Sequence, residues 1–263
     1  MSTHNTDFRS EVTQNIKSLS GDIALQKASI AWLCETAKHR YSYNFSSLGR
    51  PIIQYPQDMV AMQELIWTVK PDLIVETGIA HGGSLVMSAA ALALLDYCDA
   101  VESGHPLDVT KPRRKVLGVD IDIRAHNRAA IETHPMAHRI EMIQGSSVAS
   151  ETIAQVKDWV ARAGAQTTVM VCLDSNHTHE HVLMELNAYA NLTSVGSYCV
   201  VFDTVVEDMP AESFPNRPWG KGNNPKTAVW EFLKSHSEFE IDKAIDHKLL
   251  VSVAPDGYLK RVR

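Results

Sequence analysis

The chain lacks an excess of positive charge and lacks closely paired cysteines. Its 263 residues carry 25 Lys and Arg against 31 Asp and Glu, which gives a formal net charge of -6. Proteins that bind nucleic-acid backbones need a basic surface, so we expect no nucleic-acid partner. The four cysteines form no Cys-x-x-Cys pair, and Cys172 and Cys199 lie within apolar, strand-like runs. Buried, reduced thiols are therefore expected, as is typical of a cytoplasmic protein.

Targeting and membrane-spanning patterns are also missing. Residues 1–10 are polar and lack the apolar centre of a signal peptide. We find no apolar run that approaches the length of a membrane span. The sequence thus predicts a cytoplasmic protein without a membrane partner. A length of 263 residues and a hydrophobic content of 44% favour one large α/β domain with a substantial core.

The most informative segment is a glycine-rich turn that follows the apolar run 73–75. It reads Glu-x-Gly-x-x-x-Gly-Gly-Ser, with Glu76, Gly78, Gly82 and Ser84 at its key positions. Neither the Gly-x-Gly-x-x-Gly of dinucleotide dehydrogenases nor the Gly-Lys-Ser/Thr of a P-loop is present. A strand, a tight glycine loop and a helix start form the usual site for a nucleotide-like cofactor. The spacing resembles the first motif of class I S-adenosylmethionine-dependent methyltransferases, although an ordinary turn that uses glycine for packing is an alternative.

Strand-like and helix-like segments alternate along the chain. We expect residues 1–48 to form an N-terminal helical extension and residues 49–263 to form the main domain. The alternation predicts a doubly wound, Rossmann-like α/β fold with a mostly parallel sheet and helices on both faces. A long polar insertion, 96–115, separates the first helix of this domain from its second strand. The expected strands are 73–75, 116–119, 140–143, 169–173 and 197–202, with a closing hairpin from 239–241 and 249–253.

Two strand ends carry further candidates for cofactor binding. Asp120 follows the second expected strand directly. An acid at that place can accept hydrogen bonds from both ribose hydroxyls, as in nicotinamide and adenosylmethionine enzymes. Ser146 follows the third expected strand, where class I methyltransferases often contact adenine. The alternatives are that Asp120 caps a turn and that Ser146 is an ordinary turn residue.

Asp174 and Asp203 each come at the end of an expected strand, on the carboxyl edge of the sheet where ligands bind. Two carboxylates there suit Mg²⁺, which lowers the pKa of a hydroxyl that it binds. His177 lies shortly after Asp174 and is a candidate general base, because imidazole titrates near neutral pH. The alternatives are capping by the aspartates, a solvated helix start, and a zinc site from His177 and His181, although no His-Glu-x-x-His motif is present.

With these residues in hand, the chain resembles the cephalosporin hydroxylase and rhamnosyl O-methyltransferase family from about residue 49 to residue 263. The motifs that carry the resemblance are Pro-Ile-Ile-Gln-Tyr-Pro-Gln-Asp at 51–58, Glu-Thr-Gly at 76–78, Gly-Gly-Ser at 82–84, Leu-Asp-Ser-Asn-His-Thr at 173–178, Gly-Ser-Tyr at 196–198, Trp-Gly-Lys-Gly-Asn-Asn-Pro at 219–225 and Pro-Asp-Gly-Tyr-Leu-Lys-Arg at 255–261.

The resemblance implies a class I methyltransferase fold that binds S-adenosylmethionine, with Mg²⁺ or a similar divalent cation on the substrate side. Asp174 then contributes to the cofactor site as well as to the metal site. Despite the hydroxylase name, we find no convincing triad of two histidines and one carboxylate, as an iron oxygenase needs.

The expected metal site departs from the pattern of catechol-type methyltransferases, in which an adjacent acidic pair follows the fifth strand. Asp203 matches one member, but Phe202 and Thr204 stand where the second oxygen ligand is expected. Glu207 or Asp208 from the next loop are candidates for the missing ligand. Otherwise the cation has fewer protein ligands and more water.

The leading interpretation is Mg²⁺-assisted O-methylation of a hydroxyl on a sugar or a glycosylated natural product. The alternative is a cofactor-binding accessory protein that helps a partner enzyme and turns over little itself. The incomplete acidic pair favours the accessory protein, whereas the pairing of Asp174 with His177 favours catalysis. A nicotinamide oxidoreductase disagrees with the glycine spacing and with the absence of Tyr-x-x-x-Lys. A homo-oligomer is also expected from the family resemblance and from the helical extension, which often packs either on the core domain or on a second subunit.

Overall fold

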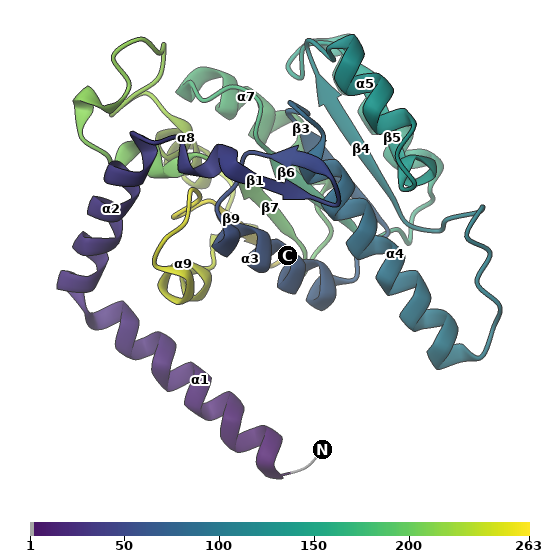
Figure 1. Cartoon of the computed structure of the whole chain (residues 1–263), viewed down its shortest axis with the longest axis horizontal. Helices are drawn as coiled ribbons and strands as arrows, with labels where there is room; N and C mark the ends of the chain where they lie inside the picture. The colour runs from purple at the N-terminus through teal and green to yellow at the C-terminus, as the bar shows by residue number, and fades with distance from the viewer. Residues whose placement is uncertain (1–2) are drawn as a thin grey trace.

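A central sheet organises the molecule, and the computed structural model describes residues 3–263 (Figure 1). Its strands lie in the order β5-β4-β3-β6-β7-β9-β8, in which β3 to β7 are parallel and β9 pairs antiparallel with both β7 and β8. This order confirms the expected Rossmann-like α/β fold. The strands are β3 (Leu73–Thr77), β4 (Lys115–Asp120), β5 (Ile140–Gln144), β6 (Val169–Leu173), β7 (Tyr198–Val201), β8 (Phe239–Ile241) and β9 (Tyr258–Arg261).

The strand order reverses between β3 and β6, which lie side by side although a long stretch of chain separates them. Every residue of these two strands is buried, because helices cover both faces of a parallel sheet. Thr77 pairs with Val119 on one side and with Leu173 on the other, so the strands end at the same level. A reversal of this kind opens a crevice at the carboxyl edge, where ligands bind in doubly wound sheets.

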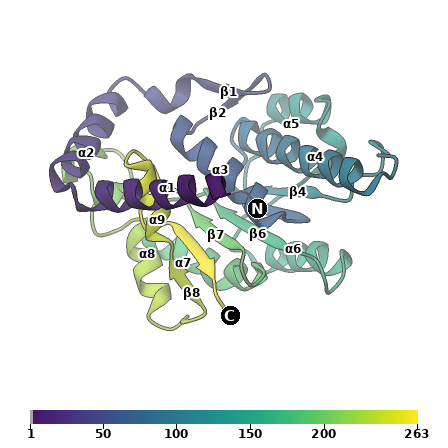
Figure 2. The same ribbon diagram turned by 90° about the horizontal axis from the view of Figure 1, so that it is seen from below.

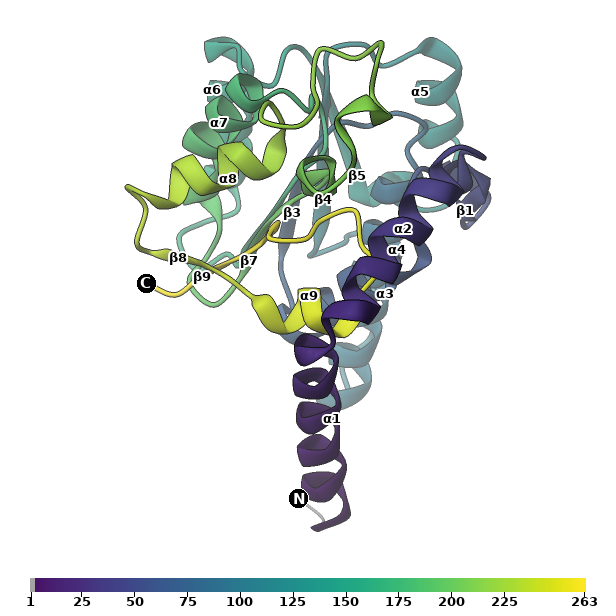
Figure 3. The ribbon, with the colours of Figure 1, turned by 90° about the vertical axis from the view of Figure 1, so that its left-hand side faces the viewer.

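Helices cover the sheet on both sides, as Figures 2 and 3 show. Helices α3 and α4 pack on one face and bury residues such as Ile66 and Leu85. Helices α6, α7 and α8 pack on the other face and bury residues such as Leu186 and Phe232. The helix bounds are α1 Thr3–Gly21, α2 Ile23–Ala37, α3 Pro56–Val69, α4 Gly83–Ser103, α5 Ala125–Glu132, α6 Ser150–Arg162, α7 His179–Tyr189, α8 Pro225–Leu233 and α9 Lys243–Leu249.

Helix α4 corrects the expectation that no apolar run reaches the length of a membrane span. By length and composition alone it is long and apolar enough to cross a membrane. Leu85, Val86, Ala89 and Leu92 of this helix are completely buried in the core. Packing on the sheet therefore accounts for the apolar character of this part of α4.

The N-terminal segment contains α1 and α2, and α1 projects away from the sheet (Figures 1 and 3). Leu33 of α2 is buried, and Trp32 makes edge contacts with Tyr41 and Tyr55. These contacts join α2 to the chain that enters α3. The domain boundary at residue 48 stays a prediction.

Two local predictions were wrong. The second strand of the closing hairpin is Tyr258–Arg261, whereas most of 249–253 is irregular. Asp242 begins α9 by accepting a hydrogen bond from the backbone N–H of Ala244, and this helix occupies the chain after β8. The extension 1–48 was expected to be helical, but its end contains β1 (Phe45–Ser47), which forms a small hairpin with β2 (Arg50–Ile52).

Candidate active site

A cavity of about 240 Å³ lies at the carboxyl ends of β3, β6 and β7. Residues 51–54 before α3 and the glycine loop after β3 form part of its wall. Asp174 after β6 and Asp203 after β7 complete it on the opposite side. The cavity therefore lies where the strand order predicts a ligand. The lining residues are Ser42, Tyr43, Pro51, Ile52, Ile53, Gln54, Gly78, Ile79, Ala80, His81, Gly83, Ser84, Asp174, Ser175, His177, Asp203 and Val253.

The glycines of the loop are required by the fold itself. Gly78 has a φ of +89°, and a Cβ there would collide with the backbone carbonyl of Asp174. Gly82 has a φ of +81°, and a Cβ there would collide with the side chain of Ile131. Packing therefore explains both positions, and the cofactor role must rest on the cavity beside them. Gly78 lines that cavity, whereas Gly82 is not among its lining residues.

Ser84 joins the cavity to a buried acid beneath it. Its hydroxyl donates a hydrogen bond to the carboxylate of Glu76, which is 4% exposed. Burial raises the pKa of Glu76 to about 7, and the hydrogen bond from Ser84 opposes that rise. Glu76 is not among the residues that line the main cavity, but its hydrogen-bond partner Ser84 is.

The two candidates for the ribose and the adenine lie away from the cavity lining. One oxygen of Asp120 accepts hydrogen bonds from the backbone of Ile79 at 2.8 Å and Ala80 at 3.3 Å, and the other accepts one from Asp122 at 2.9 Å. Asp120 thus stabilises the glycine loop, as the capping alternative supposed. The carbonyl of Ser146 accepts a hydrogen bond from the backbone of Ala149, as an ordinary turn does. A cofactor contact by Asp120 or Ser146 stays a prediction.

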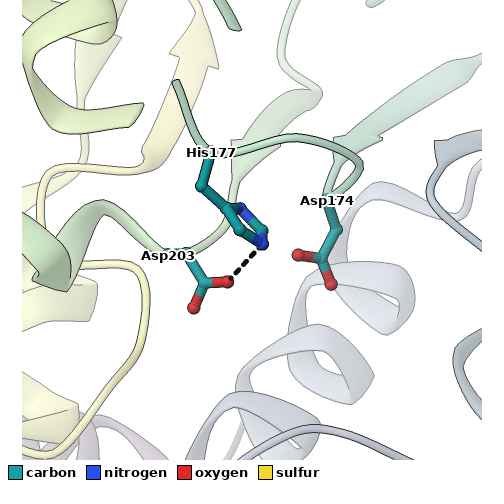
Figure 4. Close-up of side chains that lie close together, drawn as sticks. All are labelled: Asp174, His177 and Asp203. Atoms are coloured by element: carbon teal, nitrogen blue, oxygen red, sulfur yellow. Dashed lines mark ion pairs between the residues drawn. The ribbon is translucent and has the colours of Figure 1, made fainter. Parts of the chain in front are cut away.

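Asp174, His177 and Asp203 come together across the cavity (Figure 4). One ligand atom from each of the three side chains lies within 4.8 Å of the others. The Nε2 of His177 is 3.1 Å from Oδ2 of Asp203. Trp219 meets the imidazole edge-on, with ring centroids 4.8 Å apart, and thereby limits its rotation. Two carboxylates and one imidazole can hold a divalent cation or move a proton.

The charge around Asp174 favours a bound cation. Burial raises the pKa of Asp174 well above its usual range, and the nearby carboxylates of Asp203 and Glu76 raise it further. Within residues 3–263, no lysine or arginine lines the cavity to offset these carboxylates. A cationic ligand would therefore stabilise the ionised aspartates.

The expected third metal ligand is not in this cluster. The carboxylate of Glu207 accepts hydrogen bonds from the backbone N–H of Gly222 at 2.7 Å and from the side-chain amide of Asn224 at 2.5 Å. It holds the loop before α8 and lies outside the cluster of Asp174, His177 and Asp203, so a role for Glu207 as a metal ligand stays a prediction. Phe202 packs in the core, and the buried Thr204 donates its hydroxyl hydrogen to a backbone carbonyl.

The geometry also disagrees with the alternative of a zinc site held by His177 and His181. His181 Nε2 lies 3.0 Å from the hydroxyl of Ser147, 3.2 Å from that of Ser175 and 3.6 Å from the carboxylate of Glu185. The Nε2 of His177 faces Asp203 instead. The two histidines therefore do not converge on one cation.

Gln54 lines the cavity, and reasoning from the sequence gave it no role. Its Nε2 lies 3.5 Å from Oδ2 of Asp174, at the limit of a hydrogen bond. The signal available in the sequence was its place in the 51–58 motif, which fixes no chemistry by itself.

Comparison with known proteins identifies the family. The family model Rhamnosyl O-methyltransferase/CmcI matches residues 39–262. A rhamnosyl O-methyltransferase of Mycobacterium bovis is 27% identical over 205 residues, which cover 78% of this chain and 73% of that protein. One of Mycobacterium leprae is 26% identical over 215 residues, which cover 81% and 82%.

The fold agrees with that assignment. A solved structure of CmcI, described as containing Mg and SAM, superposes with a TM-score of 0.53 at 17% identity and covers 84% of this chain and 78% of that one. At this identity the likeness concerns the fold, and it confirms the expected class I methyltransferase architecture. The family match over residues 39–262 confirms the resemblance seen in the sequence, and the chain belongs to the rhamnosyl O-methyltransferase/CmcI family of O-methyltransferases.

Proposed function

We propose that the protein transfers a methyl group from S-adenosylmethionine to a hydroxyl of a sugar or sugar-bearing molecule, with help from a divalent cation. The cluster of Asp174, His177 and Asp203 beside the glycine loop carries this proposal. The names of the relatives support a rhamnosyl acceptor, and the Mg and SAM described for CmcI support the cofactor and the cation.

The residues of the cavity fit both groups. The methionine end of S-adenosylmethionine carries an ammonium, a sulfonium and one carboxylate and is positive overall, and the cavity wall contains carboxylates without a lysine or arginine in the described chain. Carboxylate oxygens are the ligands that Mg²⁺ prefers, and Mg²⁺ usually keeps several waters. Asp174 and Asp203 would therefore hold the cation, with water and acceptor oxygens at the other positions.

The roles of the side chains follow from the distances between them. When bound, S-adenosylmethionine supplies the methyl group and the cation lowers the pKa of the acceptor hydroxyl. His177 takes the hydroxyl proton at the ring nitrogen that does not donate to Asp203, because a neutral imidazole has one unprotonated nitrogen that can act as a base. Asp203, at 3.1 Å, stabilises the imidazolium that results, and Trp219 keeps the ring in place. Fixed positions matter because methyl transfer is an in-line displacement.

One observation favours a second candidate function. Phe202 and Thr204 supply no carboxylate beside Asp203, and Glu207 is engaged elsewhere. A site with only two carboxylates suits a cofactor-binding accessory protein with little turnover of its own. The two functions differ in whether the purified protein alone methylates an acceptor.

The assembly and location are further proposals. We propose a homo-oligomer in which the extension 1–48 contacts a second copy, supported by the projection of α1 and the 61% exposure of Phe8 on it. Light scattering of the full chain, and of a chain that starts after the extension, tests this. We also propose a cytoplasmic location, supported by four free cysteines.

The activity is tested by incubating the protein with Mg²⁺, S-adenosylmethionine carrying a labelled methyl group, and a panel of rhamnosides and other glycosides. We expect label in at least one acceptor. Asp174→Ala should abolish this transfer because the cation site is lost, while cofactor binding is weakened but retained, because the glycine loop remains and only one carboxylate beside the cofactor is removed. Loss of cofactor binding in that variant would contradict the role given to Asp174. Transfer that requires an added partner protein would support the accessory function.

A further inference from the structure

Gln54 is a buried side chain whose hydrogen bonds are incomplete. It follows β2, just before α3, and it is 6% exposed. Its Nε2 donates to Oδ2 of Asp174, whereas its Oε1 is buried without a partner among the described residues. A buried acceptor is costly unless a donor reaches it, so a ligand or water is expected to supply one.

The position of Gln54 indicates which ligand that is. Gln54, Ser84 and Asp174 line the main cavity, and all three also line a smaller cavity of about 10 Å³ beneath it. Gln54 thus stands between the start of α4 and the acid at the end of β6. Its polar contact is with Asp174, and no contact with Asp203 or His177 is found in residues 3–263. The amide therefore meets the carboxylate cluster at Asp174 and lines the same two cavities as Ser84 of the glycine loop.

The missing partner of the Gln54 Oε1 must be a hydrogen-bond donor. The surrounding carboxylates favour a donor that carries a positive charge. An alkyl ammonium offers three N–H donors and no acceptor. The wall around Gln54 contributes carboxylate oxygens and, within the described chain, no cationic side chain that could serve as the donor. The α-ammonium of a methionine-type cofactor meets both requirements.

We propose that Gln54 recognises the α-ammonium of S-adenosylmethionine, with Oε1 accepting its hydrogen bond while Nε2 holds the carboxylate of Asp174. This inference rests on the proposed function and adds a recognition residue to it. One amide thereby ties the position of the cofactor to that of the acid that holds the cation. Gln54 is a cofactor-binding residue in this account and takes no part in proton transfer.

The test compares two ligands that differ in the methionine end. S-Adenosylhomocysteine has the α-ammonium, whereas 5′-methylthioadenosine lacks the whole amino-acid portion. Both are titrated calorimetrically into the wild type and into Gln54→Met, which keeps the chain length and removes the amide. One series contains a chelator and no metal, and a second series contains Mg²⁺. The matched control is Gln57→Met, because Gln57 also has a buried, unpartnered Oε1 but does not line the main cavity.

We expect Gln54→Met to weaken binding of S-adenosylhomocysteine by about tenfold, as for loss of one hydrogen bond to a charged group. Its binding of 5′-methylthioadenosine should change by less than about twofold, and Gln57→Met should bind both ligands as the wild type does. Circular dichroism spectra and unfolding midpoints check that each variant is folded.

Two results would overturn the inference alone: unchanged binding of S-adenosylhomocysteine by Gln54→Met, or equal weakening of both ligands. An effect of Gln54→Met that appears only when Mg²⁺ is added would assign the amide to the cation and would also overturn it. Failure of the wild type to bind S-adenosylhomocysteine would instead overturn the proposed function, and the inference with it.

Discussion

The Nε2 of His177 lies 3.1 Å from Oδ2 of Asp203, although the two residues follow different strands. β6 leads to His177 and β7 leads to Asp203, and these strands pair in parallel, so their loops meet at one edge of the sheet. Asp203 has a φ of +55°, a conformation that is strained for an aspartate. The strained turn and the edge-on Trp219 together keep the carboxylate and the imidazole in contact.

Replacement of His177 by alanine tests the general base. We expect kcat to fall by about 10²–10⁴-fold, the usual contribution of a positioned base, with little change in cofactor affinity. The control is His126→Ala, because His126 is exposed on α5. Steady-state kinetics and cofactor titration give both quantities. A His177→Ala enzyme with wild-type kcat would show that the base is another group.

Two acidic residues close in sequence should differ sharply in their effect on the cation. Asp203→Asn should weaken Mn²⁺ binding at least about tenfold, because Asp203 lies in the three-residue cluster. Glu207→Gln should leave it unchanged, since Glu207 bonds to Gly222 and Asn224. Electron paramagnetic resonance of free Mn²⁺ measures the affinity directly. Equal loss in both variants would return Glu207 to the metal site.

The buried acid Glu76 makes folding stability depend on pH. Burial raises its pKa from 4.5 to about 7, so the folded state binds its proton more tightly than the unfolded state does. Its contribution to stability is therefore full below pH 4.5 and is lost as the pH rises through about 7. As the pH rises from 4.5 to above 7, the free energy of unfolding should fall less for Glu76→Gln than for the wild type. The difference between the two proteins should reach up to about 3 kcal/mol.

Urea unfolding of the ligand-free protein at several pH values measures this difference. The wild type and the variant should diverge most above neutral pH, where Glu76 is ionised when buried. Parallel stability curves for the two proteins would show that Glu76 titrates normally and that Ser84 and its surroundings solvate the charge.

The sequence was enough to predict the part of the fold that rests on continuous apolar runs. Val169–Leu173 is buried throughout, and such a run has few alternatives to a central strand. The run 249–253 has a similar composition, yet α9 ends at Leu249 and Leu250 turns to a φ of +58°. This run does not form the expected strand because Asp242 caps α9 and because β9 pairs with β7 instead. The composition of the run reveals neither contact.

The same distinction applies to the candidate site, where contacts set by the parallel sheet could be predicted and contacts between distant loops could not. Asp174 and Asp203 could be brought together from sequence because parallel strands share an edge. Glu207 could not be placed, because its partners Gly222 and Asn224 belong to a loop whose path has no sequence code. Gln54 was missed because the packing of Pro51 against Gly83, which sets this loop over the start of α4, is a contact between distant segments.

Calorimetric titration of S-adenosylhomocysteine into the purified protein, with and without Mg²⁺, determines whether the cavity is a cofactor site. We expect binding in the micromolar range and a change in affinity or enthalpy when Mg²⁺ is present, since Asp174 is proposed to border both the cofactor and the cation. Absence of binding under both conditions would contradict the assignment of the cavity beside Gly78 and Ser84 to S-adenosylmethionine.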